Sequence, residues 1–122
     1  MKLLTLAGTF AVVRLDPSAS VPEFALQSSF FSITRSLGEL SIVCEEGLVP
    51  DDLKAEKGWR ILKVDGVLDF NLTGILASIA NPLAEAKISI FAVSTYDTDY
   101  ILIKAEILSH ALNVLSAHGF EL

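Results

Sequence analysis

Hydrophobic and polar residues form two kinds of pattern in the second half of the chain, and both patterns are clear. Apolar residues recur at helical spacing in two stretches, which predicts helices over residues 72–86 and 105–118. Runs rich in β-branched and aromatic residues predict three strands, over residues 59–64, 88–94 and 100–104. The order of these elements is therefore strand, helix, strand, strand, helix.

A last short strand is expected at residues 120–122, which would complete a βαββαβ order. This is the split βαβ arrangement of ferredoxin-like folds, in which two helices cover one face of a sheet. Pro82 lies inside the first helical stretch and removes one backbone donor there. We therefore expect a kink near Asn81, or a restart of the helix at that point.

The first half of the chain shows the same strands but no helical stripe. Strands are expected over residues 3–6, 9–15, 30–35 and 39–45. Residues 16–29 contain Pro17 and Pro22 and predict a long loop where the second half has a helix. The two halves could be divergent copies of one plan, although the residues alone do not establish a repeat.

The polar stretch from Glu45 to Lys57 separates the halves and predicts a turn, a short helix and a connector. The predicted fold class is α+β, with two ferredoxin-like βαββαβ modules. Residues 1–57 would form an N-terminal module that lacks a clear first helix, and residues 58–122 a C-terminal module.

Composition excludes several classes of protein. The formal net charge of the 122 residues is −6, which argues against a nucleic-acid binder because phosphate contacts need clustered Lys and Arg. The apolar run after Met1 meets Arg14 too early for a membrane span, which needs about 20 apolar residues. A single cysteine, Cys44, allows no intramolecular disulfide and is expected to be a small buried residue. These features together indicate a cytoplasmic protein with no membrane contact.

The predicted topology brings two polar segments to one end of the sheet. The start of the first helix, residues 69–75, and the hairpin at residues 94–99 would be neighbours there. Free N–H groups at the helix start could hold a carboxylate, and Asp97 or Asp99 could hold an ammonium group. Donors for a carboxylate beside an acceptor for an ammonium group suit an α-amino acid. A purely structural role is equally physical, with Asp69 or Asn71 capping the helix and the aspartates solvating the hairpin.

Catalytic and metal-binding constellations are not apparent. Asp97-Thr98-Asp99 matches the Asp-x-Asp of some phosphatases and glycosyltransferases, but a three-residue match is weak and the chain has no room for their other motifs. His110 and His118 are eight positions apart and have no partner at ligand spacing. We therefore expect no enzyme activity, no metal and no cofactor.

Residues 69–86 and 88–103 resemble the first helix and the following strand pair of ACT domains. The pattern Pro-Leu-Ala-Glu followed by Ser-Thr-x-x-x-Asp-Tyr is similar to that of small bacterial tandem-ACT proteins related to the CASTOR arginine sensors of animals. Residues 10–17 and 30–35 resemble the N-terminal part of the same proteins. The resemblance implies a regulatory protein of two ACT modules.

The resemblance also implies a site, because ACT domains usually bind amino acids where two modules meet. Positions that match the ligand site of the arginine sensors are Leu72, Gly74, Ile75, Ser89, Ile90, Thr95 and Asp99. Tyr96 and Asp97, with Asp99, match a partner-contact surface of those sensors, in which position 97 carries an amide. The sensors have four modules and this chain has two, so a complete site would need a second copy in a homodimer.

The function expected from the sequence is therefore a non-enzymatic regulatory protein that binds an amino acid or a similar small metabolite at an interface between ACT modules. The alternative is a protein–protein interaction module with no ligand.

Overall fold

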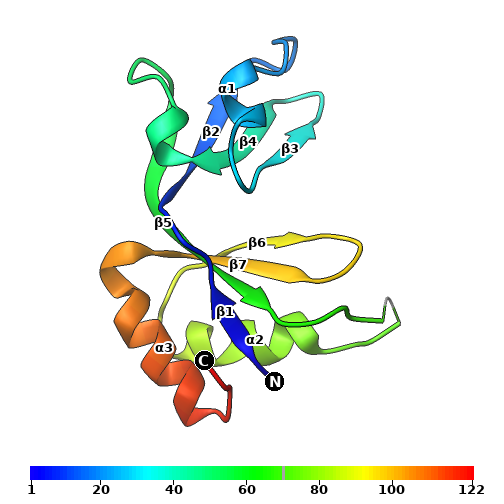
Figure 1. Ribbon diagram of the computed structural model, residues 1–122, viewed down its shortest axis with the longest axis vertical. Coiled ribbons are helices and arrows are strands. Elements are labelled where there is room, and N and C mark those ends of the chain that lie inside the picture. The colour runs from blue at the N-terminus through cyan, green and yellow to red at the C-terminus, as the bar shows by residue number, and fades with distance from the viewer. Residues whose placement is uncertain (70) are drawn as a thin grey trace. The chain divides into compact units, whose positions relative to one another are not determined.

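The computed structural model of the chain describes residues 1–69 and 71–122, and Phe70 lies outside the described residues (Figure 1). The described strands are β1 (Leu3–Thr5), β2 (Phe10–Leu15), β3 (Ser32–Arg35), β4 (Leu40–Glu45), β5 (Ala55–Val64), β6 (Phe91–Ser94) and β7 (Asp99–Lys104). The α-helices are α1 (Glu23–Leu26), α2 (Ile75–Glu85) and α3 (Leu108–Ala117), and 3-10 helices occur at Glu46–Leu48 (η1) and Ala105–Ile107 (η2).

The chain divides into two compact units, and one of them is interrupted in sequence. Unit 1 comprises Met1–Ala7 and Arg60–Leu122, and unit 2 comprises Gly8–Trp59. Strand β5 serves both, because Ala55 and Trp59 pair with β2 whereas Leu62 and Val64 pair with β1. The contiguous division at residue 57 that the sequence suggested therefore differs from the observed units, since the first seven residues join the C-terminal unit.

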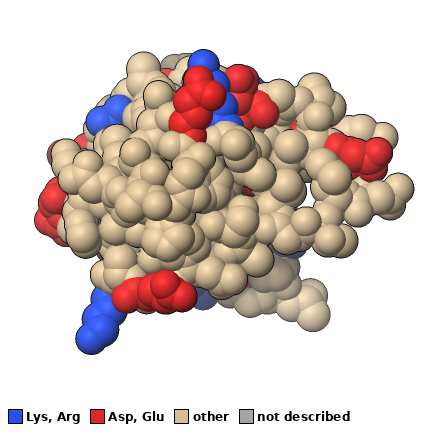
Figure 2. Space-filling view, turned by 90° about the horizontal axis from the view of Figure 1, so that it is seen from below, with Lys and Arg blue, Asp and Glu red and all other residues tan. Residues whose placement is uncertain are grey.

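Unit 1 is a sheet with two helices on one face. Strand β1 is antiparallel to β5, β5 lies beside β7, and β7 is antiparallel to β6. Helices α2 and α3 pack side by side against this sheet in Figure 1, and their outer side, seen from below in Figure 2, carries few charged residues. The buried residues that join sheet and helices are Leu3, Leu62, Val64, Ile79, Leu83, Ile88, Ile101, Ile103, Ala111 and Leu115.

The strands of unit 2 are arranged like those of unit 1, but the helix beside them, α1, is only one turn long. Strand β4 pairs antiparallel with both β2 and β3, and β2 pairs antiparallel with β5. Strands β4 and β7 occupy matching positions in the two units. Each is followed directly by a 3-10 helix, η1 after β4 and η2 after β7. The buried residues of unit 2 are Ala11, Val13, Ala25, Leu40, Ile42, Cys44 and Val49.

The fold class expected from the sequence is confirmed, and several details differ. Residues 16–29 contain the one-turn helix α1, so this segment is not wholly a loop. Helix α2 runs through Pro82 to Glu85 without a restart at Asn81. The expected last strand is reduced to a single bridge between Glu121 and Lys2. Helix α2 begins at Ile75, three residues later than the stripe suggested, because Gly74 at its N-cap is in the left-handed region with φ 79°.

No helix in residues 1–69 and 71–122 combines the length and apolar character needed to cross a membrane.

Candidate functional site

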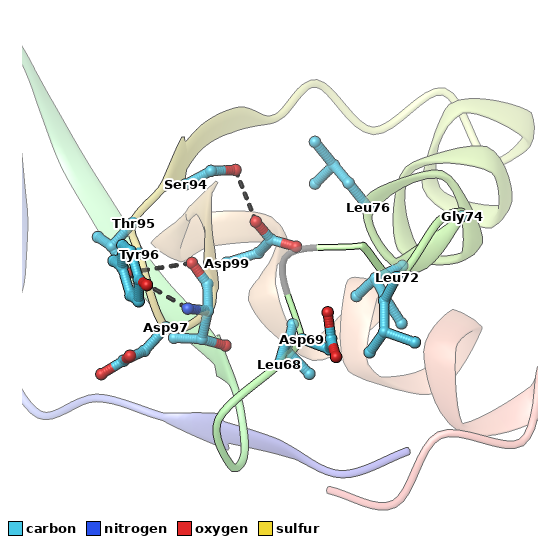
Figure 3. Close-up of a pocket in the computed structure, with 12 residues that line it drawn as sticks. Leu68, Asp69, Leu72, Gly74, Leu76, Ser94, Thr95, Tyr96, Asp97 and Asp99 are labelled. Atoms are coloured by element: carbon cyan, nitrogen blue, oxygen red, sulfur yellow. Dashed lines mark hydrogen bonds between the residues drawn. The ribbon is translucent and has the colours of Figure 1, made fainter.

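A pocket of about 260 Å³ lies in unit 1 between the start of α2 and the β6–β7 hairpin (Figure 3). It is lined by Leu68, Asp69, Leu72, Gly74, Ile75, Leu76, Ser94, Thr95, Tyr96, Asp97, Thr98 and Asp99. The two segments that the sequence analysis expected to be neighbours therefore meet at one site.

Backbone and hydroxyl hydrogen bonds fix the hairpin wall of this pocket. The buried Thr98 hydroxyl donates to the carbonyl oxygen of Val64, at the end of β5, over 2.8 Å. Within the hairpin, the Thr95 N–H donates to the Thr98 carbonyl over 2.8 Å. The Leu68 N–H donates to the Asp97 carbonyl over 2.7 Å. The hairpin is thus held both to the central strand and to the segment that leads into α2.

The opposite wall is the N-terminus of an α-helix. Gly74 is the N-cap residue of α2, no side chain caps the helix, and its first turn contains no acidic residue. The first N–H groups of a helix have no partner within the helix, and the helix dipole places partial positive charge at this end. Gly74, Ile75 and Leu76 line the pocket, so this end of the helix can receive an anionic group such as a carboxylate.

Carboxylates supply the charge on the other side of the pocket. The Asp99 carboxylate accepts a hydrogen bond from the Ser94 hydroxyl over 2.6 Å, and in Figure 3 it points toward α2. The Asp97 carboxylate points away from α2 in the same view. Asp69 accepts from the Asn71 N–H over 2.8 Å in a local turn. The described lining residues include three aspartates and no Lys, Arg or His, so the site favours a ligand with a positive group.

A purely structural role for these polar residues, in capping the helix or solvating the hairpin, is only partly observed. Asp69 closes a turn onto Asn71, but neither residue caps α2, because Gly74 occupies the N-cap position. The expectation that Asp69 or Asn71 caps the helix was therefore wrong. A glycine with positive φ turns the chain into the helix without a side-chain oxygen, which leaves the helix start open toward the pocket.

Most of the expected site residues come together in the pocket, and two do not. Leu72, Gly74, Ile75, Thr95 and Asp99 line it, and so do the expected partner-contact residues Tyr96 and Asp97. Ser89 and Ile90 precede β6 and are not among the lining residues. Ser89 is exposed, and Ile90 packs against the core of unit 1.

Five lining residues were not proposed from the sequence as site residues, namely Leu68, Asp69, Leu76, Ser94 and Thr98. Leu76 follows Leu72 at helical spacing, and Ser94 directly precedes Thr95, so their positions could have been inferred from neighbouring site residues. Leu68 carried no such signal, because it lies in the segment between β5 and α2 whose path only the hydrogen bond to Asp97 reveals.

Groups suited to metal or thiol chemistry are not gathered elsewhere in the described part of the chain. Among residues 1–69 and 71–122, no three His, Cys, Asp or Glu side chains are placed so that they could hold a metal ion. Cys44 is buried in β4, and burial, with a smaller effect of the Glu45 carboxylate, raises the pKa of its thiol. A thiol in that state is a poor nucleophile.

Comparison with protein families shows two matches, one mostly within each unit. The model of the ACT domain matches residues 54–117, which include the pocket. A second family model, which describes an N-terminal domain, matches residues 8–52.

Named relatives and solved structures resemble the chain along most of its length. The human protein named cytosolic arginine sensor for mTORC1 subunit 1 is 33% identical over 113 residues, covering 80% of this chain and 34% of that protein. The chain thus spans about a third of the length of this relative. An Agobacterium tumefaciens protein of known crystal structure is 38% identical, with a TM-score of 0.94 over 99% of this chain and 90% of that one.

A more distant structure shares the fold alone. The regulatory subunit of aspartate kinase from Thermus thermophilus has a TM-score of 0.66 and 8% identity, over 96% of this chain and 97% of that chain.

Proposed function

Because the chain belongs to the ACT-domain family and is related to the CASTOR-type arginine sensors, we propose that it is a non-enzymatic sensor whose pocket binds an α-amino acid. One observation carries the proposal: the uncapped N-terminus of α2 and the Asp99 carboxylate face the same pocket. The helix end suits the carboxylate of an amino acid, and Asp99 suits its ammonium group. A ligand-binding regulatory role agrees with the family and with the names of its relatives.

Arginine is the first candidate ligand. After Asp99 is assigned to the ammonium group, Asp69 remains at the pocket, and Asp97 lines it with its carboxylate pointing away from α2. Among the described lining residues there is no Lys, Arg or His to balance them. A second positive group on the ligand would therefore be favoured over a neutral or acidic side chain. The name of the human relative, a cytosolic arginine sensor, supports the same choice and the expected cytoplasmic location.

A second copy of the chain would complete the site. Leu72 and Tyr96 line the pocket but are 54% and 80% exposed, which leaves apolar surface at its rim. Exposed apolar rims of this kind are covered in protein interfaces. In this proposal Ser89 and Ile90, which do not line the pocket of their own copy, belong to the surface that a second copy presents.

Calorimetry with L-arginine tests the proposal most directly. Replacing Asp99→Asn removes a charged acceptor, and a charge-assisted hydrogen bond contributes about 1.5–3 kcal/mol. We expect the affinity of this variant to fall about 10-fold to 100-fold. The matched control is Asp52→Asn, an exposed aspartate of unit 2, which should bind as the wild type does.

A thermal-shift screen of the proteinogenic amino acids separates the sensor from the alternative of an interaction module without a ligand. A ligand at 100 times its dissociation constant should add about 2.7 kcal/mol to the free energy of unfolding. If no amino acid raises the melting temperature, the pocket does not serve as proposed. If arginine binds Asp99→Asn with wild-type affinity, Asp99 is not the ammonium acceptor.

A further inference from the structure

Two side chains that are hydrogen-bonded to each other stand at the strand end of the pocket. Ser94 is the last residue of β6, Asp99 is the first residue of β7, and the two are opposite each other in the antiparallel pairing. The Ser94 Oγ atom donates to Asp99 Oδ1 over 2.6 Å, and both residues line the pocket. Figure 3 shows this hydrogen bond, with the Asp99 carboxylate directed toward α2. The serine thus holds one oxygen of the carboxylate that the proposed function assigns to the ammonium group.

The alternation of side chains along β7 places this pair on the helix side of the sheet. Successive side chains of a strand point to opposite faces, so Asp99 shares a face with Ile101 and Ile103. Both isoleucines belong to the buried core that the sheet shares with α2 and α3. Ser94 lies on the same face, because directly paired residues of antiparallel strands do. The pair is therefore directed to the side of the sheet on which α2 begins.

The hydrogen bond restricts a carboxylate that is otherwise able to rotate. Asp99 is only partly buried, and an aspartate has two side-chain torsions. A hydroxyl that donates to an ionised carboxylate at this distance makes a charge-assisted hydrogen bond, which is stronger than one between neutral groups. A carboxylate offers about four acceptor positions, so Asp99 can accept from Ser94 and from a ligand together. An acceptor that is already oriented binds its ligand with a smaller loss of conformational entropy.

The matching hairpin of unit 2 is built without such a pair. Both hairpins are closed by an N–H to carbonyl hydrogen bond between the first and last loop residues, over 2.9 Å in unit 2 and 2.8 Å in unit 1. Arg35 and Leu40 pair in unit 2 where Ser94 and Asp99 pair in unit 1. Leu40 is fully buried, and the Arg35 guanidinium donates to backbone carbonyl oxygens of the segment that precedes α1. The hydroxyl–carboxylate pair is therefore a feature of the pocket and not a requirement of the hairpin.

We propose that Ser94 is a positioning residue, which holds the Asp99 carboxylate in the orientation that receives the ammonium group of the ligand. In this role Ser94 acts through Asp99 and does not itself contact the ligand. The inference rests on the proposed function, because it names the residue that prepares an acceptor of the same site. It follows that the hydroxyl group of residue 94 is needed for full affinity.

Calorimetry of the full chain with L-arginine tests the proposal. Ser94→Ala keeps Asp99 but removes the donor, and we expect the affinity to fall about 3-fold to 10-fold. Ser94→Thr keeps a hydroxyl at the same position and should bind within about twofold of the wild type. Ser20→Ala makes the same chemical change at an exposed serine of unit 2, so it is the matched control and should bind as the wild type does.

A double-mutant cycle separates positioning from a direct contact with the ligand. In Asp99→Ala the hydroxyl has lost its acceptor, so the addition of Ser94→Ala should change the affinity by less than about twofold. A measurement without ligand checks the hydrogen bond itself. The ¹³C resonance of the Asp99 carboxylate should shift in Ser94→Ala and return toward its wild-type position in Ser94→Thr.

The possible results keep this inference and the proposed function apart. If the wild-type chain does not bind L-arginine, the proposed function fails and this inference fails with it. If the wild type binds and Ser94→Ala binds equally well, only the positioning role is wrong and the assignment of Asp99 stands. An equal loss of affinity from Ser94→Ala with and without Asp99 would also overturn the positioning role, since the serine would then act on the ligand itself.

Discussion

A single buried hydroxyl connects the hairpin wall of the pocket to the centre of unit 1. Thr98 is 4% exposed, and its Oγ1 donates to the Val64 carbonyl oxygen at the end of β5. Val64 in turn belongs to the core and pairs with Leu3 of β1. The position of Asp99, one residue farther along, therefore depends on this contact.

We predict that Thr98→Val lowers the free energy of unfolding by about 1–3 kcal/mol, because the shape is kept while a buried carbonyl loses its donor. Arginine binding should weaken as well, since the hairpin is less well fixed. Chemical denaturation measures the first effect and calorimetry the second. Thr73→Val, at an exposed threonine before α2, is the control and should change stability by less than about 0.5 kcal/mol.

Acid sensitivity has a local source in unit 2. The Ser29 hydroxyl and the Ser29 N–H both donate to the Glu45 Oε1 atom, and these hydrogen bonds lower the pKa of Glu45 from its ordinary value of 4.5. The folded carboxyl therefore binds a proton less readily than the unfolded one. Its contribution to stability is present above pH 4.5 and is lost as the pH falls through the lower folded pKa.

We predict that in Ser29→Ala the free energy of unfolding falls less steeply as the pH is lowered. The variant should be less stable than the wild type above pH 4.5. The difference in the free energy of unfolding should shrink at lower pH, where Glu45 becomes protonated in the wild type and in the variant. Denaturation at a series of pH values measures this. The exposed Ser20→Ala is the control. A gap between wild type and Ser29→Ala that stays constant down to the most acid pH would contradict the assignment.

At the scale of elements, the start of α2 decides whether the pocket has an open helix end. Gly74 has φ 79° and ψ 0°, a left-handed conformation that costs side-chain-bearing residues energy. A Cβ atom added there would meet nothing within 4 Å, so the requirement for glycine comes from the backbone and not from packing.

We predict that Gly74→Ala lowers the free energy of unfolding by about 1 kcal/mol through backbone strain. The matched control is Gly47→Ala, because Gly47 also has nothing within 4 Å of its Cβ position but does not have a left-handed φ. Denaturation with urea compares the two variants. Equal effects of both substitutions would show that strain at Gly74 is not the cause.

For the molecule as a whole, the main consequence of the topology is that unit 1 is built from two distant pieces of chain. Residues 1–7 supply β1, residues 60–122 supply the rest, and unit 2 lies between them in sequence. Leu3 is 2% exposed and belongs to the same core as residues of α2 and α3. The integrity of the candidate site therefore depends on a strand that is more than 50 residues away in sequence.

We predict that Leu3→Ala lowers the free energy of unfolding by about 2–5 kcal/mol, the usual cost of a core leucine. Leu37→Ala is the matched control, because Leu37 is fully exposed, and it should have an effect below about 0.5 kcal/mol. Denaturation monitored by the fluorescence of Trp59 measures both. A small effect of Leu3→Ala would mean that β1 contributes little to unit 1.

Local patterns determined the elements of this protein and the place of the site. The stripe from Ile75 to Leu83 and the β-branched strands of the second half predicted a ferredoxin-like unit, because burial on one face imposes a fixed period on apolar residues. The same order placed the start of α2 beside the β6–β7 hairpin, and five of the seven expected ligand residues line the pocket found there. Their role in binding remains a prediction.

Only the tertiary structure decided how the pieces combine. Neither the pairing of Leu3 with Val64 nor the open helix start at Gly74 leaves a periodic signal, because the first depends on a partner 61 positions away and the second on one backbone angle. The exclusion of Ser89 and Ile90 from the pocket was decided in the same way, by where β6 begins. Sequence periodicity reports which face of an element is buried, whereas long-range pairing and single dihedral angles are set by the packing of the whole unit.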